Sequence, residues 1–348
     1  MTTPHYPLKF DPIYKEKVWG GRTLEKLGRR LPGDATTRIG ESWELADLKQ
    51  TSASGGGGTA EHSTIVNGPL AGQTIDTLLA ADKTDVIGDA ALSDDGGFPL
   101  LLKLLDARQN LSVQVHPSPA YAAEHDDAHL KSEAWYVVDC EPGAVIYKGV
   151  KPGTTPADLR AALEKNTDDA VVPLLIEVPV QPGDCHYLPS GTCHALGAGV
   201  LVAEVQTPSD TTFRVYDWGR TGRELHVEEA LACTTFGPAE TGDAEKQATV
   251  DAGEGVTSTR LVRTEYFRID RLTAQAGTEG DVGQGLPRMW MVLRGSGELR
   301  CATEGPTPFG PGETLLLPAA MAEGAWSIHE DATLLEVTLP DAGTTRLA

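Results

Sequence analysis

The chain has 348 residues and a formal net charge of −21 at pH 7, from 29 Lys and Arg against 50 Asp and Glu. This charge excludes nucleic acid as an expected partner, because binding to a phosphate backbone depends on clustered Lys and Arg. No segment approaches the ~20 apolar residues of a membrane span, and the N-terminus lacks the basic and apolar regions of a secretory signal. We therefore expect a cytoplasmic protein of about two domains that does not bind a membrane.

The pattern along the chain is typical of a mainly β protein. Short β-type runs separated by Gly, Pro, Asn and Asp turns predict strands at 134–138, 144–147, 200–205, 289–294 and 314–317. Four helical patterns are expected to be insertions on this framework, at 74–81, 119–130, 156–165 and 226–232. The glycine-rich stretch 52–59 is expected to be a surface loop. The chain is therefore predicted to form an antiparallel β-sandwich or jelly roll.

The stretch 240–255, rich in Gly, Ala and charged residues, is the best linker candidate. It predicts a first domain over residues 1–250 and a second over 256–348. Turn patterns at 289–298 and 311–318 repeat those of the first domain, but Pro318-Ala-Ala-Met321 stands where the first domain has Pro-Ser-Gly and then a histidine. The second domain is therefore expected to be a metal-free β-sandwich.

The first domain contains a candidate metal site on its predicted strands. Gln114 and His116 are two residues apart in an extended segment and so share one face. Glu133 and His194 complete a four-ligand set that suits a zinc-like ion with an open coordination position. Taken alone, a histidine before proline is more often a turn or core residue, and Glu133 fits a solvated strand edge. Turns at 182–184 and 189–191 predict that His194 lies on a tight hairpin between strands 185–188 and 192–196.

The cysteines were weighed as alternative ligands. The five cysteines are odd in number and have no CxxC spacing, which argues against a disulfide framework. The repeated pairs Cys185-His186 and Cys193-His194 suggest a structural zinc site with two Cys and two His. Strand alternation argues against that site, because adjacent residues point to opposite faces.

The Gln-x-His segment with its later Glu, and the Pro-Ser-Gly turn followed by His194, resemble the two cupin motifs. Four further segments sharpen the resemblance: Val18-Trp-Gly-Gly21, Ile39-Gly-Glu-Ser-Trp-Glu44, the segment 98–106 and the segment 203–218. Together they resemble the zinc-dependent type I mannose-6-phosphate isomerases in their shorter bacterial form, in order from about residue 10 to 218.

The resemblance implies a bicupin fold and one Zn²⁺ per chain, held by Gln114, His116, Glu133 and His194. It also implies an aldose–ketose isomerase that interconverts mannose 6-phosphate and fructose 6-phosphate through an enediolate, as a monomer or homodimer. A divalent ion would polarise the oxygens on C1 and C2. Alternatively, the ion would stay bound to protein and water and order the substrate.

Two residues compete for the proton transfer that this reaction needs. Lys131 precedes Glu133 by two residues and so shares its face, where a neighbouring dication would depress its pKa. Glu204 lies on the apolar strand 200–205, and without the resemblance it would be interpreted as a strand-edge carboxylate. The resemblance places both at the active site and leaves the choice open.

Three more residues receive roles from the resemblance. Composition alone favours a surface salt bridge for Arg214, whereas the resemblance assigns it to the active site, where its planar fork would suit a phosphate or oxyanion. Lys103 and Ser112 map to positions that line the substrate or contact its phosphate. As an isolated residue, Lys103 needs a partner or a pocket, because a buried ammonium is costly.

Two other functions remain open at this point. A non-catalytic metallocupin that senses a sugar or a sugar phosphate would use the same metal set. A cupin dioxygenase typically binds iron with a His-rich set, and this set holds a Gln and two His. Trp19 and Trp43 are expected mainly to pack the domain, with lining of the sugar cleft as the alternative.

Overall fold

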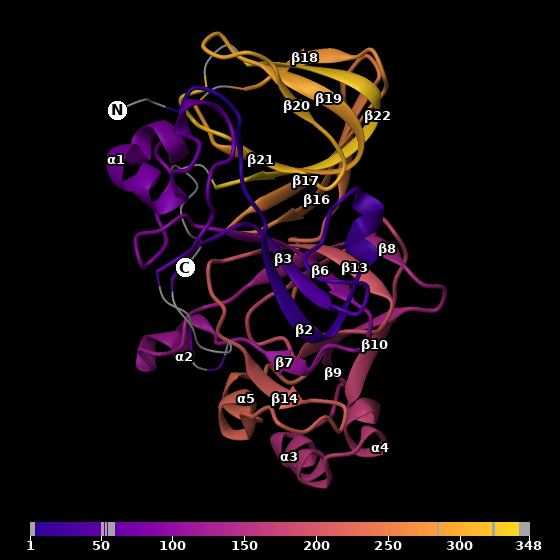
Figure 1. The fold of residues 1–348 in the computed structure, drawn as a ribbon. Coiled ribbons are helices and arrows are strands. Elements are labelled where there is room, and N and C mark those ends of the chain that lie inside the picture. The colour runs from indigo at the N-terminus through magenta and orange to yellow at the C-terminus, as the bar shows by residue number, and fades with distance from the viewer. Residues whose placement is uncertain are drawn as a thin grey trace.

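The computed structural model describes residues 4–49, 52, 54, 60–283, 285–321 and 324–340. Two β units are stacked along the long axis of the molecule, one formed mostly by the N-terminal two thirds of the chain and the other by the last third (Figure 1). The fold is mainly β with antiparallel sheets, as predicted, and matches the bicupin class. The predicted glycine-rich loop at 52–59 lies largely outside the described residues.

The N-terminal unit contains two facing sheets. The six-stranded sheet has the order β11 (Cys185–Leu188), β8 (Glu133–Cys140), β13 (Val200–Gln206), β6 (Leu101–Ala107), β2 (Ile13–Gly21) and β3 (Ile39–Leu45). The five-stranded sheet has the order β10 (Leu175–Pro179), β9 (Val145–Val150), β12 (His194–Leu196), β7 (Val113–Val115) and β14 (Phe213–Tyr216). A small pair is formed by β4 (Asp47–Leu48) and β5 (Glu61–His62).

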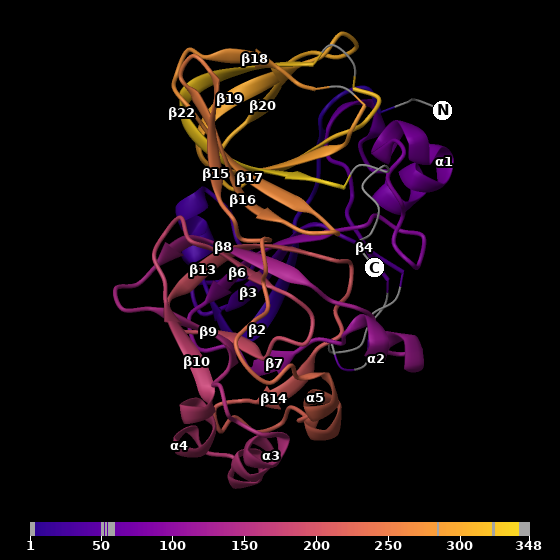
Figure 2. The ribbon, with the colours of Figure 1, turned by 180° about the vertical axis from the view of Figure 1, so that it is seen from behind.

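The C-terminal unit is built on one long, strongly bent sheet. Its order is β1 (Leu8–Lys9), β21 (Thr314–Leu317), β19 (Arg288–Arg300), β22 (Ala325–Thr338), β17 (Arg268–Ala274), β16 (Val256–Arg263) and β15 (Ala248–Gly253). Two short strands join it at the far end, β18 (Glu279–Asp281) on β22 and β20 (Thr307–Phe309) on β19. Figure 2 shows this sheet curling around its own interior.

The central strands of the six-stranded sheet are buried on both faces, which explains why they lack alternation. Every residue of β6 and of β13 is buried. One face packs on the five-stranded sheet through residues such as Leu105, Ile146 and Leu196. The other face packs against the C-terminal sheet, where Tyr136 and Ile269 belong to the same apolar cluster. Polar residues on the inner face of this sheet are therefore shielded from bulk water.

Helices cover the remaining surfaces. α3 (Pro156–Lys165) is confirmed at its predicted bounds and begins with a capping box between Thr155 and Asp158. α5 (Val227–Cys233) is within one residue of its prediction, and α2 (Pro119–Glu124) stops short of residue 130. α1 (Ile75–Ile87) is interrupted at Asp82, directly after the predicted end at residue 81, and a second helical stretch follows the kink. The remaining helical segments are α4 (Asp168–Val171) and short 3-10 helices at Thr23–Leu27, Gly68–Leu70 and Val172–Leu174.

Two predictions about local connectivity were wrong. β11 and β12 do not form a hairpin, because β11 pairs with β8 whereas β12 pairs with β7 and β9 in the facing sheet. The predicted linker 240–255 contains β15, which pairs with β16 in the C-terminal sheet. The division into domains at 1–250 and 256–348 stays a prediction, to which these pairings add that β1 and β15 both belong to the C-terminal sheet.

The glycines of the two N-terminal motifs allow β2 and β3 to approach closely. A Cβ atom placed on Gly20 would lie 2.5 Å from the backbone nitrogen of Gly40. A Cβ atom on Gly40 would lie 2.6 Å from Cβ of Lys17 and 2.7 Å from the ring of Trp19. Any side chain at these positions would force the strands apart.

Candidate active site

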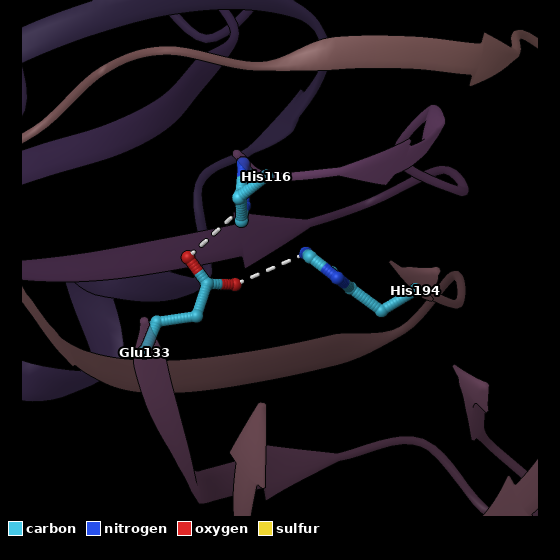
Figure 3. Close-up of side chains that lie close together, drawn as sticks. All are labelled: His116, Glu133 and His194. Carbon is cyan, nitrogen blue, oxygen red and sulfur yellow. Dashed lines mark ion pairs between the residues drawn. The ribbon is translucent and has the colours of Figure 1, made fainter. Parts of the chain in front are cut away.

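Three of the predicted ligands meet between the two sheets of the N-terminal unit. Glu133, at the start of β8, points its carboxylate toward the imidazoles of His116 and His194 (Figure 3). Its carboxylate oxygens are 3.4 Å from His116 Nε2 and 3.2 Å from His194 Nε2. All three residues are buried, and their ligand atoms lie within 4.8 Å of one another. The Pro-Ser-Gly turn carries the chain from one sheet to the other, which places His194 opposite Glu133.

Both imidazoles are fixed with Nε2 directed at the carboxylate. His116 Nδ1 donates to the carbonyl oxygen of Thr211 at 3.0 Å, and His194 Nδ1 donates to that of Thr192 at 2.7 Å. A carbonyl can only accept, so these contacts place the proton on Nδ1 and leave Nε2 of each ring as an acceptor. Gln114 lies beside this cluster, because its side-chain amide nitrogen is 3.3 Å from His194 Nε2; its role as a ligand stays a prediction.

The protonation states suit cation binding. Burial first, and then the charge of Lys131, lower the pKa of His116 to about 3, so its imidazole is neutral. Burial alone would raise the pKa of Glu133, but Lys131 and His116 outweigh it and hold that pKa well below the usual range. His116 Nε2 is buried without a hydrogen-bond partner among the described residues, and the buried carboxylate of Glu133 faces Lys131 Nζ and the two imidazoles. A buried acceptor without a partner is costly unless it binds something.

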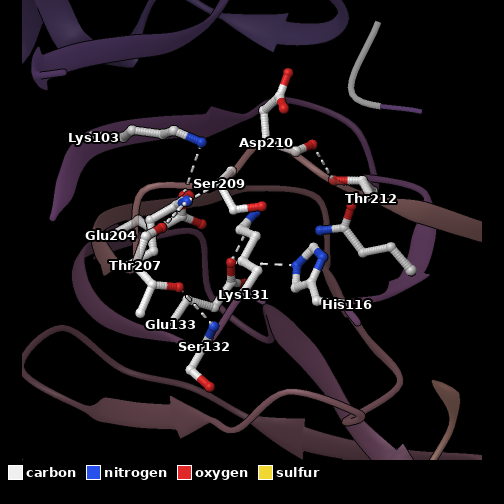
Figure 4. A network of polar contacts seen from close by, with 12 residues as sticks. Lys103, His116, Lys131, Ser132, Glu133, Glu204, Thr207, Ser209, Asp210 and Thr212 are labelled. Atoms are coloured by element: carbon white, nitrogen blue, oxygen red, sulfur yellow. Dashed lines mark hydrogen bonds and ion pairs between the residues drawn. The ribbon is translucent and has the colours of Figure 1, made fainter. Parts of the chain in front are cut away.

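A second cluster of charges adjoins the ligands on the inner face of the six-stranded sheet. Lys131 Nζ is 3.0 Å from Glu133 Oε2, and Lys103 Nζ is 3.3 Å from Glu204 Oε1 (Figure 4). Glu204 and Lys103 are direct partners across β13 and β6, so their side chains share a face. The structure thus brings both candidate bases, Lys131 and Glu204, beside the ligand cluster. Burial lowers the pKa of Lys131, but Glu133 and Glu204 outweigh it and leave that pKa raised.

Two donors hold Glu204 in place, the neutral indole of Trp135 and the ammonium group of Lys103. Trp135 Nε1 donates to its Oε2 at 2.9 Å, while Lys103 faces its Oε1. Burial and the negative charge of Glu133 raise the pKa of Glu204, and Lys103 opposes that rise. The indole of Trp135 also packs edge-on to His194, with ring centroids 5.3 Å apart. Trp135 therefore links the carboxylate to the ligand cluster.

Lys103 has a second carboxylate neighbour that the sequence analysis missed. Glu41 Oε2 lies 4.0 Å from Lys103 Nζ and accepts a hydrogen bond from Trp43 Nε1 at 2.7 Å. Lys103 Nζ also lies 5.0 Å from the centre of the Trp43 ring, and Lys17 Nζ is 3.0 Å from Glu41. Trp43 is thus part of this charge cluster, whereas Trp19 packs in the apolar cluster between the sheets. The Gly-Glu-Ser-Trp motif was the available signal for Glu41.

Arg214 lies on the facing sheet. It is the direct partner of Gln114 across β14 and β7, so both side chains leave the sheet on the same face. Its Nη1 donates to the carbonyl oxygen of Glu224 at 2.7 Å, and its Nε is buried without a hydrogen-bond partner among the described residues. Burial, and next Arg223, lower the pKa of Arg214. Arg220 and Arg223 both pair with Asp217, so three arginines gather near this strand.

The polar segment after β13 is a structural support for the ligands. Gln206, fully buried, donates to the carbonyl oxygens of Thr207 and Ser209. Thr207 Oγ1 accepts from the backbone N–H of Ser132 and donates to the carbonyl of Leu130. These bonds connect this segment to the residues that precede Glu133. Ser112 is buried two residues before Gln114, and its predicted place at the substrate stays a prediction.

Comparisons with known proteins agree on one family. A family model described as phosphomannose isomerase type I, catalytic domain, matches residues 8–146. The mannose-6-phosphate isomerase ManA of Bacillus subtilis is 35% identical over 332 residues, covering 93% of this chain and 96% of the relative. This chain belongs to the type I mannose-6-phosphate isomerase family. A mannose-6-phosphate isomerase of Streptococcus mutans is 33% identical over 94% of this chain and 97% of its own.

Solved structures share the architecture. The crystal structure of the mannose 6-phosphate isomerase from Bacillus subtilis matches with a TM-score of 0.80 and 31% identity, over 95% of this chain and 99% of that one. A putative mannosephosphate isomerase from Archaeoglobus fulgidus matches with a TM-score of 0.72 at 22% identity, which concerns the fold alone. The similarity covers both β units. In addition, no helix among the described residues is long and apolar enough to cross a bilayer.

Proposed function

We propose that this chain is a zinc-dependent isomerase that interconverts mannose 6-phosphate and fructose 6-phosphate by proton transfer between C1 and C2. The observation that carries the proposal is the convergence of His116, Glu133 and His194, whose ligand atoms are buried and lie within 4.8 Å of one another, with Gln114 beside His194. Two imidazoles, a carboxylate and an amide suit Zn²⁺. Membership of the family supports the sugar phosphate as substrate.

When bound, the ion would supply a positive charge beside the oxygens on C1 and C2. Lys131 or Glu204 would move the proton, since both adjoin the ligand cluster and both are buried. Burial excludes bulk water from the site. This protects the enediolate from competing proton exchange and strengthens the electrostatic interactions between the local charges. Lys103 and Trp135 would hold Glu204 in one orientation during the transfer.

The cationic side chains near the cleft would bind an anionic substrate. We propose that Arg214 contacts the substrate, with its unpaired Nε as a free donor, and that Arg220 and Arg223 extend this positive region toward the phosphate. Lys103 and Ser112 would line the opposite part of the cleft. Because the whole chain carries −21, these local charges must offset a repelling field. Cytoplasmic location and a monomeric or homodimeric state remain part of this proposal.

The test combines turnover with metal content. Purified protein given mannose 6-phosphate should form fructose 6-phosphate, lose that activity to a chelator and regain it with zinc. His194→Ala should lose both zinc and turnover. Its matched control is Cys193→Ser, because Cys193 is adjacent in sequence but packs in the apolar cluster on the other side of the strand. Stoichiometric zinc with full activity in His194→Ala would overturn the ligand assignment.

Two further measurements separate the residue roles. Exchange of the C2 proton with solvent should fall by about 10²–10⁴-fold in whichever of Lys131→Ala and Glu204→Gln removes the base. Unchanged exchange in both would exclude both candidates. A non-catalytic sensor would bind the sugar phosphate but show neither exchange nor turnover in the wild type.

A further inference from the structure

The C-terminal unit has a cavity of its own, and none of its lining residues belongs to the ligand cluster. It has a volume of about 710 Å³ and is lined by residues of β16, β17, β19, β22 and the segment that precedes β15. These strands turn Trp290, Leu272 and Leu334 toward the interior of the unit, and the cavity lies at the open end of that interior. Ile269 and Met289, which alternate with the lining residues, pack on the opposite face against the N-terminal unit.

The cavity concentrates positive charge in an acidic protein. Five of its lining residues are cations: Lys246, Arg260, Arg263, Arg268 and Arg288. Four are acids: Asp243, Glu265, Asp270 and Glu336. The lining is thus slightly positive in a chain whose acids outnumber its cations by 50 to 29. Such a local reversal of sign is needed wherever a strongly acidic protein is to hold an anion.

Strand register places three of the arginines on one line. Arg263 is directly opposite Arg268 across β16 and β17, and Arg268 and Arg288 are both opposite Thr338 of β22. Their side chains therefore leave the same face of four neighbouring strands. Like charges directly opposite in an antiparallel pair destabilise it. An anion between these side chains would relieve that repulsion.

The acids of the cavity neutralise part of this charge and leave part free. Arg268 pairs with Asp270 at 2.5 Å, and Arg288 pairs with Glu336 at 2.8 Å. Glu336 is already shared, because it also accepts from the indole of Trp290. Arg263 is exposed and has no side-chain partner among the described residues, and the buried Nε of Arg288 lacks one too. Two donors on one face are therefore available to a ligand.

We propose that this cavity is a second site, for a small molecule that carries two or more phosphate or carboxylate groups. Arginine forks bind both kinds of oxyanion by paired, charge-assisted hydrogen bonds. A single oxyanion would contact only one side of the cavity. The volume of about 710 Å³ and the line of three arginines suit a ligand with several anionic groups. The three arginines leave the C-terminal sheet on the face opposite to that of Ile269 and Met289, which pack against the N-terminal unit, so the site does not depend on the proposed reaction.

Calorimetry on the metal-loaded protein tests the proposal with two probes, fructose 1,6-bisphosphate and tricarballylate. At least one probe should bind the wild type, and the one that binds identifies phosphate or carboxylate as the recognised group. Arg263→Glu should weaken that binding by about ten-fold or more, which is the loss of about one charge-assisted contact. Arg263 is exposed at a strand end, so the variant should fold.

The matched control is Arg294→Glu. Arg294 is exposed on β19 and does not line the cavity, and its substitution changes the net charge by the same amount as Arg263→Glu. It should change the affinity by less than about two-fold, because a distant exposed charge is screened by salt. Turnover of mannose 6-phosphate should be the same in both variants, which separates this site from the catalytic cleft. Absence of binding by both probes, or equal affinity in wild type and Arg263→Glu, would overturn the proposal.

Discussion

Replacing Lys103 by Met removes the cation that two buried carboxylates share. Lys103 Nζ lies 3.3 Å from Glu204 and 4.0 Å from Glu41, and its side chain is only 6% exposed. Removing one member of a buried ion pair typically costs about 3–5 kcal/mol, because the other charge stays buried without a partner. Here Trp135 still donates to Glu204 and Lys17 still pairs with Glu41. We therefore expect a loss near the lower end, about 3 kcal/mol.

The assay is urea unfolding at pH 7, applied as a double-mutant cycle with Glu204→Gln. Glu204→Gln removes the charge that Lys103 neutralises, so the double variant should recover about 1–2 kcal/mol relative to additive losses. The control is Lys26→Met, which removes an exposed lysine paired with Asp139 and should leave stability unchanged. A loss below about 1 kcal/mol in Lys103→Met, with no coupling to Glu204, would refute the view that this cluster is held by electrostatic pairing.

Three further outcomes follow from the same sheets. Burial would raise the pKa of Glu41, but two lysines lower it to about 2. The ionised carboxylate should therefore stabilise the fold by on the order of 3 kcal/mol above pH ~4.5, and this contribution should be lost as the pH falls toward 2. The stability of Glu41→Gln in urea unfolding should accordingly depend less on acid than that of the wild type. Gly40→Ala should cost about 1–3 kcal/mol by thermal unfolding, because its Cβ would overlap a neighbouring strand, while Gly305→Ala, with nothing within 4 Å, should be neutral. Arg29→Met should cost on the order of 3 kcal/mol by breaking a buried pair with Glu44, and an equal loss with and without Glu44→Gln would contradict that pairing.

The convergence of His116, Glu133 and His194 was within reach of sequence reasoning because each residue belongs to a local pattern. The two-residue period of a strand put Gln114 and His116 on one face, and turn residues marked the position of His194. The same turn residues misled the hairpin prediction. A Pro-Gly turn fixes a change of direction but not the sheet that the next strand joins, and here β12 crosses to the facing sheet.

Partners from distant segments could not be predicted in this way. Lys103 needed a counter-charge, but nothing local indicated that it would meet Glu41 and Glu204, which come from β3 and β13. Their meeting depends on the order of strands in the sheet, which is a long-range property. β15 was missed for a related reason. Its residues are all exposed, so it lacks the buried alternation by which a strand is recognised.

The pairing of β1 with β21 has a consequence for how the chain is made. Leu8 pairs with Leu316, and Lys9 bonds to Glu313, so the first strand finds its partner roughly 300 residues later. At a synthesis rate of about 5–20 residues per second, that wait is roughly 15–60 s. The first strand still lacks its partner when β14, the last strand of the two facing sheets, has been made. A nascent chain therefore depends on the last part of the protein to secure the first, and a fusion or deletion at the N-terminus would act on the C-terminal sheet.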